Sequence, residues 1–158
     1  MKRALVAMVA VMFSTAAWSK TCETSRDTGD GKMPTPIETV RAFSAAFSEN
    51  HAEDAIRRWF TPSTVWINEG LSMTTGIEEA IRRPRSPEVA AVYFDMLAIA
   101  ADGNRVLTER LDRFVRADGS EVAALKVMGI FEIEGDCIVA WRDYFDVNRA
   151  KQMSKDRQ

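Results

Sequence analysis

The chain has 158 residues, a length typical of one domain, and 46% of them are hydrophobic, enough to form a packed core. The charged residues, 28% of the chain, nearly balance at a formal net charge of −2, and no basic run is present, so we expect no binding to nucleic acid. A single histidine, His51, excludes most zinc sites and histidine-based catalytic schemes, and we expect it in a surface turn.

The first residues have the pattern of a secretory signal. The basic Lys2 precedes an uninterrupted apolar run over 4–13, and the small residues Ala17 and Ser19 fit a cleavage site, so 1–19 reads as a signal peptide. The run is too short for a stable membrane span. We therefore expect an exported protein, periplasmic or secreted. The alternative is a cytoplasmic enzyme whose start has been placed too far upstream.

The segment 20–34 is rich in Thr, Ser, Asp, Gly and Lys, which predicts a flexible leader. It contains Cys22, and Cys137 is the only other cysteine. An oxidising compartment would permit a bond between them. Because Cys22 lies in a segment without predicted structure, we expect free thiols, with a bridge between two chains as the alternative.

Helices come next in the chain. Thr35 and Glu38 form a capping box around Pro36, and hydrophobic residues then recur at helical spacing, at Ile37, Val40, Phe43 and Phe47. A second helix is expected over 52–60, with Ile56, Trp59 and Phe60 facing inward and Pro62 after its end.

A strand and a short helix are expected between these helices and the second half. Residues 63–69 alternate, so Trp66 and Asn68 share one face of a strand. Thr75 and Glu78 suggest a second capping box, which opens a short helix to about Arg83.

The second half consists of strand-like runs separated by hairpin turns. The runs are 93–100, 105–116, 121–133 and 137–147, with turns at Asp102-Gly103-Asn104, Asp118-Gly119 and Gly135-Asp136. Helices followed by an antiparallel meander indicate the α+β class, with long strands that curl around the N-terminal helices and leave a closed pocket. The predicted domain covers 35–150, and 151–158 is a C-terminal tail.

Alternation along three of these strands brings three charges to one place. The faces expected to meet are Thr108, Arg110, Asp112 and Phe114; Leu125, Val127, Gly129 and Phe131; and Val139, Trp141, Asp143 and Phe145. An ion pair on a sheet surface is the alternative for Arg110, Asp112 and Asp143. Aromatic neighbours on the same faces favour an interior site, where charges have to be paired.

At these residues the sequence resembles the limonene-1,2-epoxide hydrolase family. The segment 107–112, Leu-Thr-Glu-Arg-Leu-Asp, is similar to the family strand that carries its catalytic Arg-x-Asp, and 141–146, Trp-Arg-Asp-Tyr-Phe-Asp, is similar to the segment that carries its second catalytic aspartate. The resemblance covers about 36–149. It implies the nuclear transport factor 2-like (SnoaL-like) fold, in which N-terminal helices pack in a strongly curved, mixed or antiparallel sheet that forms a cone-shaped pocket, and usually a homodimer.

The resemblance also implies roles for individual residues. Asp143 would deprotonate water, Asp112 would protonate the epoxide oxygen, and Arg110 would bridge the two carboxylates. Asn68 matches the family asparagine that holds the water. The family tyrosine two residues earlier is replaced here by Trp66, whose indole N–H can donate to water but cannot accept from it.

These roles agree with the chemistry of the residues themselves. Opening an epoxide near neutral pH needs a proton for its oxygen while water loses one, and two carboxylates in opposite protonation states supply both. Such a reaction needs no metal, cofactor or covalent intermediate. The expected substrate is a hydrophobic, terpene-like epoxide bound by Phe94, Phe114, Leu125, Val127, Phe131, Trp141 and Phe145.

Two other functions remain open on the same scaffold. A proton-transfer enzyme like ketosteroid isomerases or SnoaL-type polyketide cyclases would use one aspartate as base and a hydroxyl for the oxyanion, for which Tyr93 is the candidate. A domain that binds a hydrophobic ligand without catalysis is the other alternative, and the joint presence of Arg110, Asp112 and Asp143 argues against it.

Overall fold

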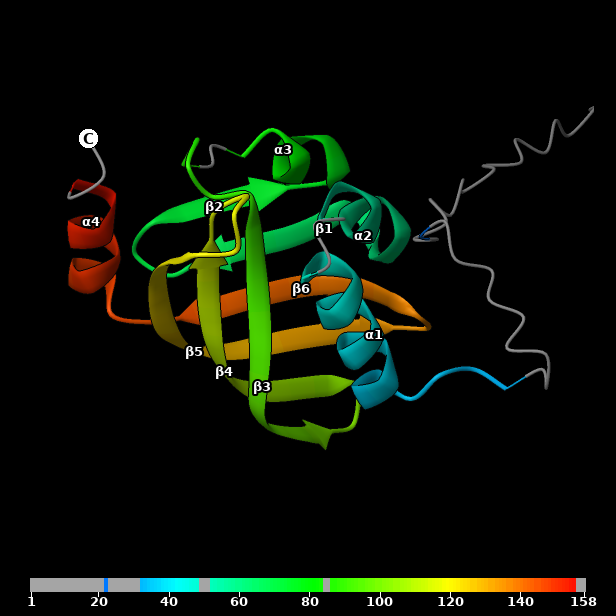
Figure 1. Ribbon diagram of the computed structural model, residues 1–158. Helices are drawn as coiled ribbons and strands as arrows, with labels where there is room; N and C mark the ends of the chain where they lie inside the picture. The colour runs from blue at the N-terminus through cyan, green and yellow to red at the C-terminus, as the bar shows by residue number, and fades with distance from the viewer. Residues whose placement is uncertain (1–21, 23–31, 49–51, 84–85, 156–158) are drawn as a thin grey trace, which may run out of the picture.

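The protein folds as helices packed against one mixed six-stranded sheet in the order β2-β1-β6-β5-β4-β3 (Figure 1). This computed structural model describes residues 22, 32–48, 52–83 and 86–155. The strands are β1 Phe60–Asn68, β2 Ser72–Thr75, β3 Ala91–Asp102, β4 Arg105–Val115, β5 Glu121–Glu134 and β6 Cys137–Tyr144. Only the β1–β6 pair is parallel, and the predicted meander from β3 to β6 is confirmed. The sheet is not closed, since β2 and β3 form its edges.

The helices in the described part of the chain are α1 Pro36–Ser48, α2 Ala52–Trp59, α3 Ile77–Ile81 and α4 Val147–Lys155. The capping box at α1 is confirmed: the Thr35 N–H donates to Glu38 Oε2 at 2.7 Å, and the Glu38 N–H donates to Thr35 Oγ1 at 3.3 Å. The second capping box was wrong. Gly76 is the N-cap of α3, one residue later than expected, so it is Glu79 that reaches back to the Thr75 N–H, at 2.8 Å.

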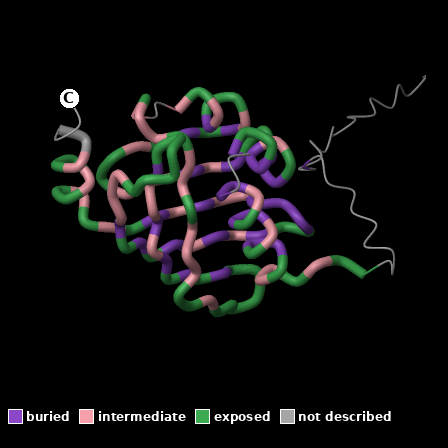
Figure 2. Tube along the Cα trace, in the orientation of Figure 1, coloured by how far each residue is buried: buried purple, intermediate pink, exposed green. Residues whose placement is uncertain are grey.

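The core lies between the helices and the inner face of the curved sheet. The helix α1 packs against β3 and α2, and α2 packs against α3. Figure 2 shows the buried positions gathered where α1 and α2 face the strands. Phe43 is fully buried at the centre, with the rings of Trp59, Phe60, Phe131 and Trp141 around it at 5.3–6.1 Å between centroids. This aromatic core fixes the sheet face on which the charged residues lie.

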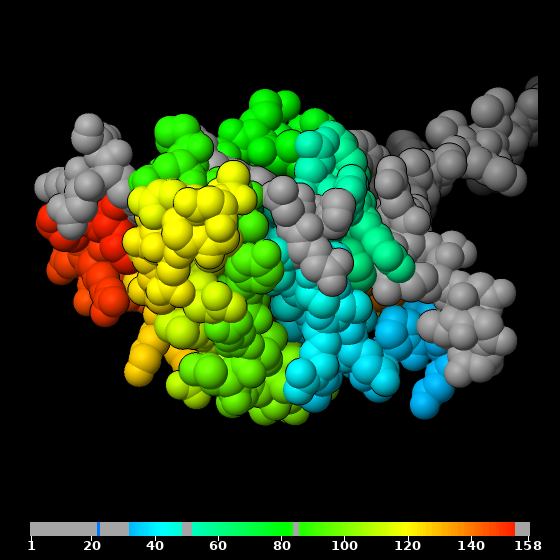
Figure 3. Space-filling view, viewed as in Figure 1, coloured from blue at the N-terminus to red at the C-terminus, as the bar shows by residue number. Residues whose placement is uncertain are grey.

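The C-terminal helix α4 was not predicted. The last strand was expected to continue to residue 147, but β6 ends at Tyr144 and α4 begins at Val147, after two intervening residues. This helix lies at the opposite end of the molecule from residues 32–35, which precede α1 (Figures 1 and 3). Among the described residues, no helix is long and apolar enough to cross a membrane.

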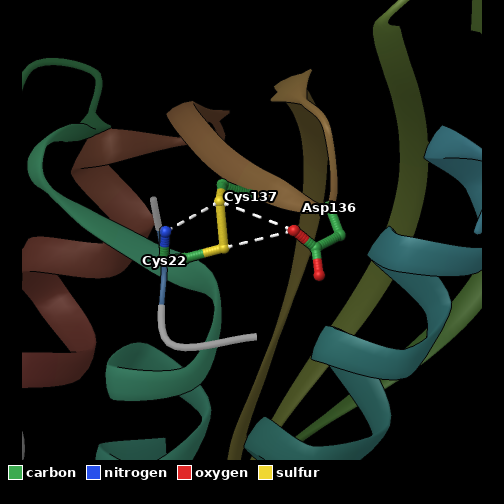
Figure 4. Close-up of side chains that lie close together, drawn as sticks. All are labelled: Cys22, Asp136 and Cys137. Carbon is green, nitrogen blue, oxygen red and sulfur yellow. Dashed lines mark hydrogen bonds between the residues drawn. A yellow bond between two sulfur atoms is a disulfide. The ribbon is translucent and has the colours of Figure 1, made fainter. Parts of the chain in front are cut away.

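A disulfide joins Cys22 to Cys137, so the expectation of free thiols was wrong. The two Cα atoms are 5.6 Å apart although the residues are separated by 115 positions in the sequence. Figure 4 shows the bond beside the turn between β5 and β6, with the Asp136 carboxylate directed toward the sulfur atoms. The N–H of Cys22 donates to Cys137 Sγ at 3.0 Å, so Cys22 is fixed by its backbone as well. The expected signal peptide, His51 and the rest of the leader up to residue 31 lie outside the described residues.

Candidate active site

Strand register brings the predicted site residues into adjacent rows on the inner face of the sheet. Thr108 on β4 pairs with Gly129 on β5, Gly129 pairs with Asp143 on β6, and Asp143 pairs with Asn68 on β1. In the neighbouring rows, Arg110 pairs with Val127, and Asp112 pairs with Leu125. The alternation predicted from sequence therefore places Arg110, Asp112 and Asp143 together.

Arg110 is the centre of this charged cluster and is fully buried. Its Nε donates to Asp112 Oδ1 at 3.0 Å and its Nη2 to Asp112 Oδ2 at 3.2 Å. Nη2 also donates to Asp143 Oδ1 at 2.9 Å, and Nη1 donates to Thr108 Oγ1 at 3.3 Å. The Phe94 ring lies 4.8 Å from the guanidinium carbon. One guanidinium thus fixes both carboxylates in a single geometry.

Gly129 provides the space that this geometry needs. A Cβ at this position would lie 2.4 Å from Arg110 Nη1, 2.6 Å from Thr108 Oγ1 and 2.9 Å from Asp143 Oδ1. The guanidinium therefore crosses β5 through the volume that any larger residue would fill. Sequence analysis placed Gly129 on this face, but the need for glycine became visible only with the neighbouring strands in place.

The two carboxylates differ in how many of their oxygens are already bound. Both oxygens of Asp112 accept from Arg110. Asp143 accepts from Arg110 and from the Trp141 Nε1 at 2.8 Å, and both of these bonds go to Oδ1. Within the described part of the chain, no hydrogen bond reaches Asp143 Oδ2. This oxygen is therefore the one that can take a proton from a bound molecule.

Burial shifts the titration of both acids in the same direction. Removal from water raises the pKa of Asp143 to about 6, against the opposing effect of the Arg110 charge. Burial also raises the pKa of Asp112. Burial opposes the charge on Arg110, but the two neighbouring aspartates raise its pKa further, so it remains a cation. With both acids ionised the cluster carries one net negative charge, and uptake of one proton by the coupled pair neutralises it.

The two aspartates open into a cavity of about 280 Å³. Six of the seven predicted substrate-binding residues line it: Phe94, Phe114, Leu125, Val127, Trp141 and Phe145. Phe131 does not line it, because its ring lies in the core, stacked on Trp141 at 5.2 Å. Tyr93 is not on the cavity side either: it is exposed, 5.5 Å from the guanidinium carbon of Arg113 on the opposite face of the sheet. The hydroxyl required by the ketosteroid-isomerase-like alternative is therefore misplaced.

Trp66 and Asn68, the residues proposed to hold water, also line the cavity, but their contacts differ. Trp66 stacks on Trp141 with ring centroids 4.4 Å apart and planes 3° from parallel. Its Nε1 is buried, and no residue in the described ranges accepts a hydrogen bond from it. Asn68 and Arg83 lie beside it in the cavity wall. Donation from Trp66 to a water stays a prediction, while Asn68 is adjacent to Asp143 by register.

Three residues that line the cavity were not predicted from the sequence. Arg83, Ala150 and Met153 line the cavity, the last two from α4. Arg83 was read only as the end of a short helix, and no local pattern shows on which side of it the cavity lies. The helical continuation after residue 146 was the signal that could have placed α4.

Comparison with known proteins agrees with this geometry. The model of the limonene-1,2-epoxide hydrolase catalytic domain matches residues 34–155. The chain belongs to that family. Among the curated members, epoxide hydrolase EphG of Mycobacterium tuberculosis is 34% identical over 110 residues, which cover 68% of this chain and 71% of that protein. Membership of the limonene-1,2-epoxide hydrolase family supports epoxide hydrolase activity in general terms.

Solved structures show the same fold. An LEH-like epoxide hydrolase from M. tuberculosis superposes with a TM-score of 0.62 at 30% identity, covering 75% of this chain and 87% of its own. A putative SnoaL-like polyketide cyclase from Jannaschia sp. CCS1 has a TM-score of 0.58 at 17% identity, covering 78% and 96%. The second likeness concerns the fold alone. The predicted nuclear transport factor 2-like architecture of this epoxide hydrolase family member is thus confirmed.

Proposed function

We propose that this chain hydrolyses small hydrophobic epoxides to vicinal diols in one step, by general acid and base catalysis without a covalent intermediate. The observation that carries the proposal is one buried arginine that binds two carboxylates, both of which open into the same apolar cavity. The buried cluster of Arg110, Asp112 and Asp143 is electrically neutral when the two carboxylates share one proton, so burial favours this protonation state. A base and an acid are then present at once.

The hydrogen bonds favour one assignment of the two roles. Asp143 has an uncommitted oxygen, so Oδ2 accepts a proton from water as the water oxygen forms a bond to one epoxide carbon. The bond from that carbon to the epoxide oxygen breaks, and the oxygen takes the proton that Asp112 holds. The diol leaves with Asp143 protonated and Asp112 ionised, and passage of one proton between them restores the starting state. Arg110 holds both acids without touching the substrate.

The cavity sets the class of substrate. Its wall is mostly aromatic and aliphatic, and among the residues that line it the charged ones are Arg83, Asp112 and Asp143. The volume of about 280 Å³ lies just below the range of about 300–1,000 Å³ typical of small-molecule sites. A cyclic, terpene-sized epoxide with no charged group matches this wall.

A single turnover in ¹⁸O-labelled water tests the proposal. Enzyme in excess over a panel of cyclic and linear epoxides should give diol labelled in the first turnover, because water attacks carbon directly. Attack by a carboxylate would instead deliver an unlabelled protein oxygen first. Unlabelled first-turnover diol, or no diol from any epoxide, would refute the proposal, and Asp143→Asn serves as the inactive control.

We further propose that the protein is exported and loses residues 1–19. The disulfide supports this, because such bonds persist in oxidising compartments. Expression from the native start in a Gram-negative host, followed by intact mass measurement, should give a chain that begins at Lys20. A periplasmic chain that retains Met1 would contradict the proposal.

We also propose that two chains form a homodimer through the outer face of the sheet. Leu107, Met128 and Tyr144 are exposed there, and Met128 and Tyr144 are paired on adjacent strands. Light scattering after size exclusion should give twice the mass of one chain, and Met128→Glu should give a single chain. A monomeric parent protein would contradict this proposal.

A further inference from the structure

Arg83 lies in the cavity wall just after α3, next to the proposed water-holding residues. Its guanidinium carbon is 4.1 Å from the centre of the Trp66 ring, in a cation–π contact. Trp66 stacks in turn on Trp141, whose indole N–H binds the Asp143 carboxylate. Arg83, Trp66 and Trp141 thus form a stack, and Trp141 binds Asp143, the proposed base.

The same guanidinium determines how the side chain of Asn68 is oriented. Both terminal nitrogens of Arg83 face one terminal atom of the Asn68 amide, with Nη1 at 3.0 Å and Nη2 closer, and they can donate hydrogen bonds to it only when that atom is Oδ1. An amide oxygen has two lone pairs, and these two donors occupy them. The opposite orientation would turn the amide N–H groups toward a cation, where they have no acceptor. Arg83 thus fixes Asn68 as a donor toward the cavity.

This orientation matters because Asn68 is held beside the base. Asn68 pairs with Asp143 across β1 and β6, and the N–H of Glu69 donates to the Asp143 carbonyl at 3.0 Å. A water between the two side chains would donate one hydrogen to Asp143 Oδ2 and accept one from Asn68 Nδ2. Its second lone pair then remains available to attack carbon, which requires that the Trp66 N–H donates no hydrogen bond to this water. With the amide reversed, Asn68 would compete with Asp143 for the hydrogens of the water.

We infer that Arg83 is a positioning residue of the hydrolytic reaction, which acts through Asn68 by holding its amide N–H toward the attacking water. This inference rests on the proposed function and adds to it a residue outside the charged cluster. Charge on the donor also polarises the amide, which strengthens the hydrogen bond that Asn68 gives. Arg83 itself needs no contact with the substrate.

Steady-state kinetics of matched variants test the inference. Arg83→Met should lower kcat about tenfold, the effect of one lost orienting hydrogen bond, while KM changes less than twofold. Asn68→Ala should cause a similar loss, and the double variant should be no slower than the slower single variant, because both changes remove one interaction. Arg83→Lys keeps a cation that can donate once and should fall between. Arg82→Met, in the exposed neighbouring residue, is the control and should match the parent.

Three kinetic results would overturn the inference. They are an Arg83→Met variant with parental kcat, an effect confined to KM, and losses in the double variant that multiply. Such results are separate from a failure of the proposed function, in which the parent protein itself turns over no epoxide.

A spectrum without substrate keeps the inference testable in either case. In a ¹H–¹⁵N correlation spectrum, the Asn68 side-chain NH₂ pair is identified by its loss in Asn68→Ala. It should shift in Arg83→Met and stay in place in Arg82→Met. An Asn68 signal indifferent to Arg83→Met would show that the arginine does not hold the amide.

Discussion

Replacing Gly129 with alanine would put a methyl group inside the charged cluster. The new Cβ would lie 2.4 Å from Arg110 Nη1 and less than 3.0 Å from Thr108 Oγ1 and Asp143 Oδ1. Ordinary van der Waals contact begins at about 3.5 Å, so the guanidinium would have to move by about 1 Å. It is fully buried and bound on several sides, so this movement breaks or lengthens its bonds to the carboxylates.

The size of the effect follows from that displacement. A misplacement of about 1 Å in a catalytic set costs on the order of 100-fold in rate. Overpacking a well-filled interior costs about 1–3 kcal/mol, which lowers the melting temperature by roughly 3–10 °C for a domain of this size. We therefore expect Gly129→Ala to fold, to melt earlier and to lose about 99% of kcat.

The assay compares kcat on the best epoxide and thermal unfolding followed by circular dichroism. Lys126→Ala, an exposed change on the same strand, is the control and should match the parent in both measurements. Equal kcat and melting temperature in Gly129→Ala would refute the reasoning, because the three side chains could then not be packed around that position as described.

Three further predictions concern the two aspartates, the pH profile and the disulfide. Asp143→Asn and Asp112→Asn should each lower kcat by about 10²–10⁴-fold with unchanged circular dichroism, since each removes one proton-transfer role; near-parental activity in either would reject the acid and base assignment. The pH profile of kcat should be bell-shaped, because the reactive pair holds one proton: beside an ionised Asp112 the pKa of Asp143 is raised to about 6, so the shared proton is lost and the rate falls as the pH rises above about 6, and the rate falls again at lower pH when the second carboxylate is protonated. A rate that stays constant from pH 4 to pH 8 would contradict it. The paired change Cys22→Ser and Cys137→Ser should lower the free energy of unfolding by about 4 kcal/mol, because the bond closes a loop of over 100 residues; urea curves of the parent and the variant that coincide would show that the bond does not constrain the unfolded chain.

Local alternation was enough to predict the charged cluster, because a strand places every second side chain on one face. That rule assigned Arg110 and Asp112 to the face of Thr108, and Asp143 to the face of Trp141. Alternation could not distinguish Phe131 from the residues that line the cavity, because all of them lie on the inner face of the sheet. The position of α1 decides which residues on that face are covered.

Features that depend on distant segments were not predictable. The bond between Cys22 and Cys137 joins residues 115 positions apart, and Cys22 lies in a segment with no periodic pattern. The direction of the Arg83 side chain depends on its contacts with Trp66 and Asn68, which are not its neighbours in the sequence. Likewise, the last strand was extended to Val147 and 151–158 was predicted as a tail, so the helix α4 over Val147–Lys155 was missed.

The bond at Cys22 also affects how the chain withstands proteases. In the exported form that we propose, residues 1–19 are removed and Cys22 becomes the third residue of the chain. An aminopeptidase would then release Lys20 and Thr21 and meet a residue held by a second covalent connection. A cut anywhere within 23–31 would leave the short piece attached to the turn between β5 and β6. A single cut there would thus release no fragment and expose no free thiol.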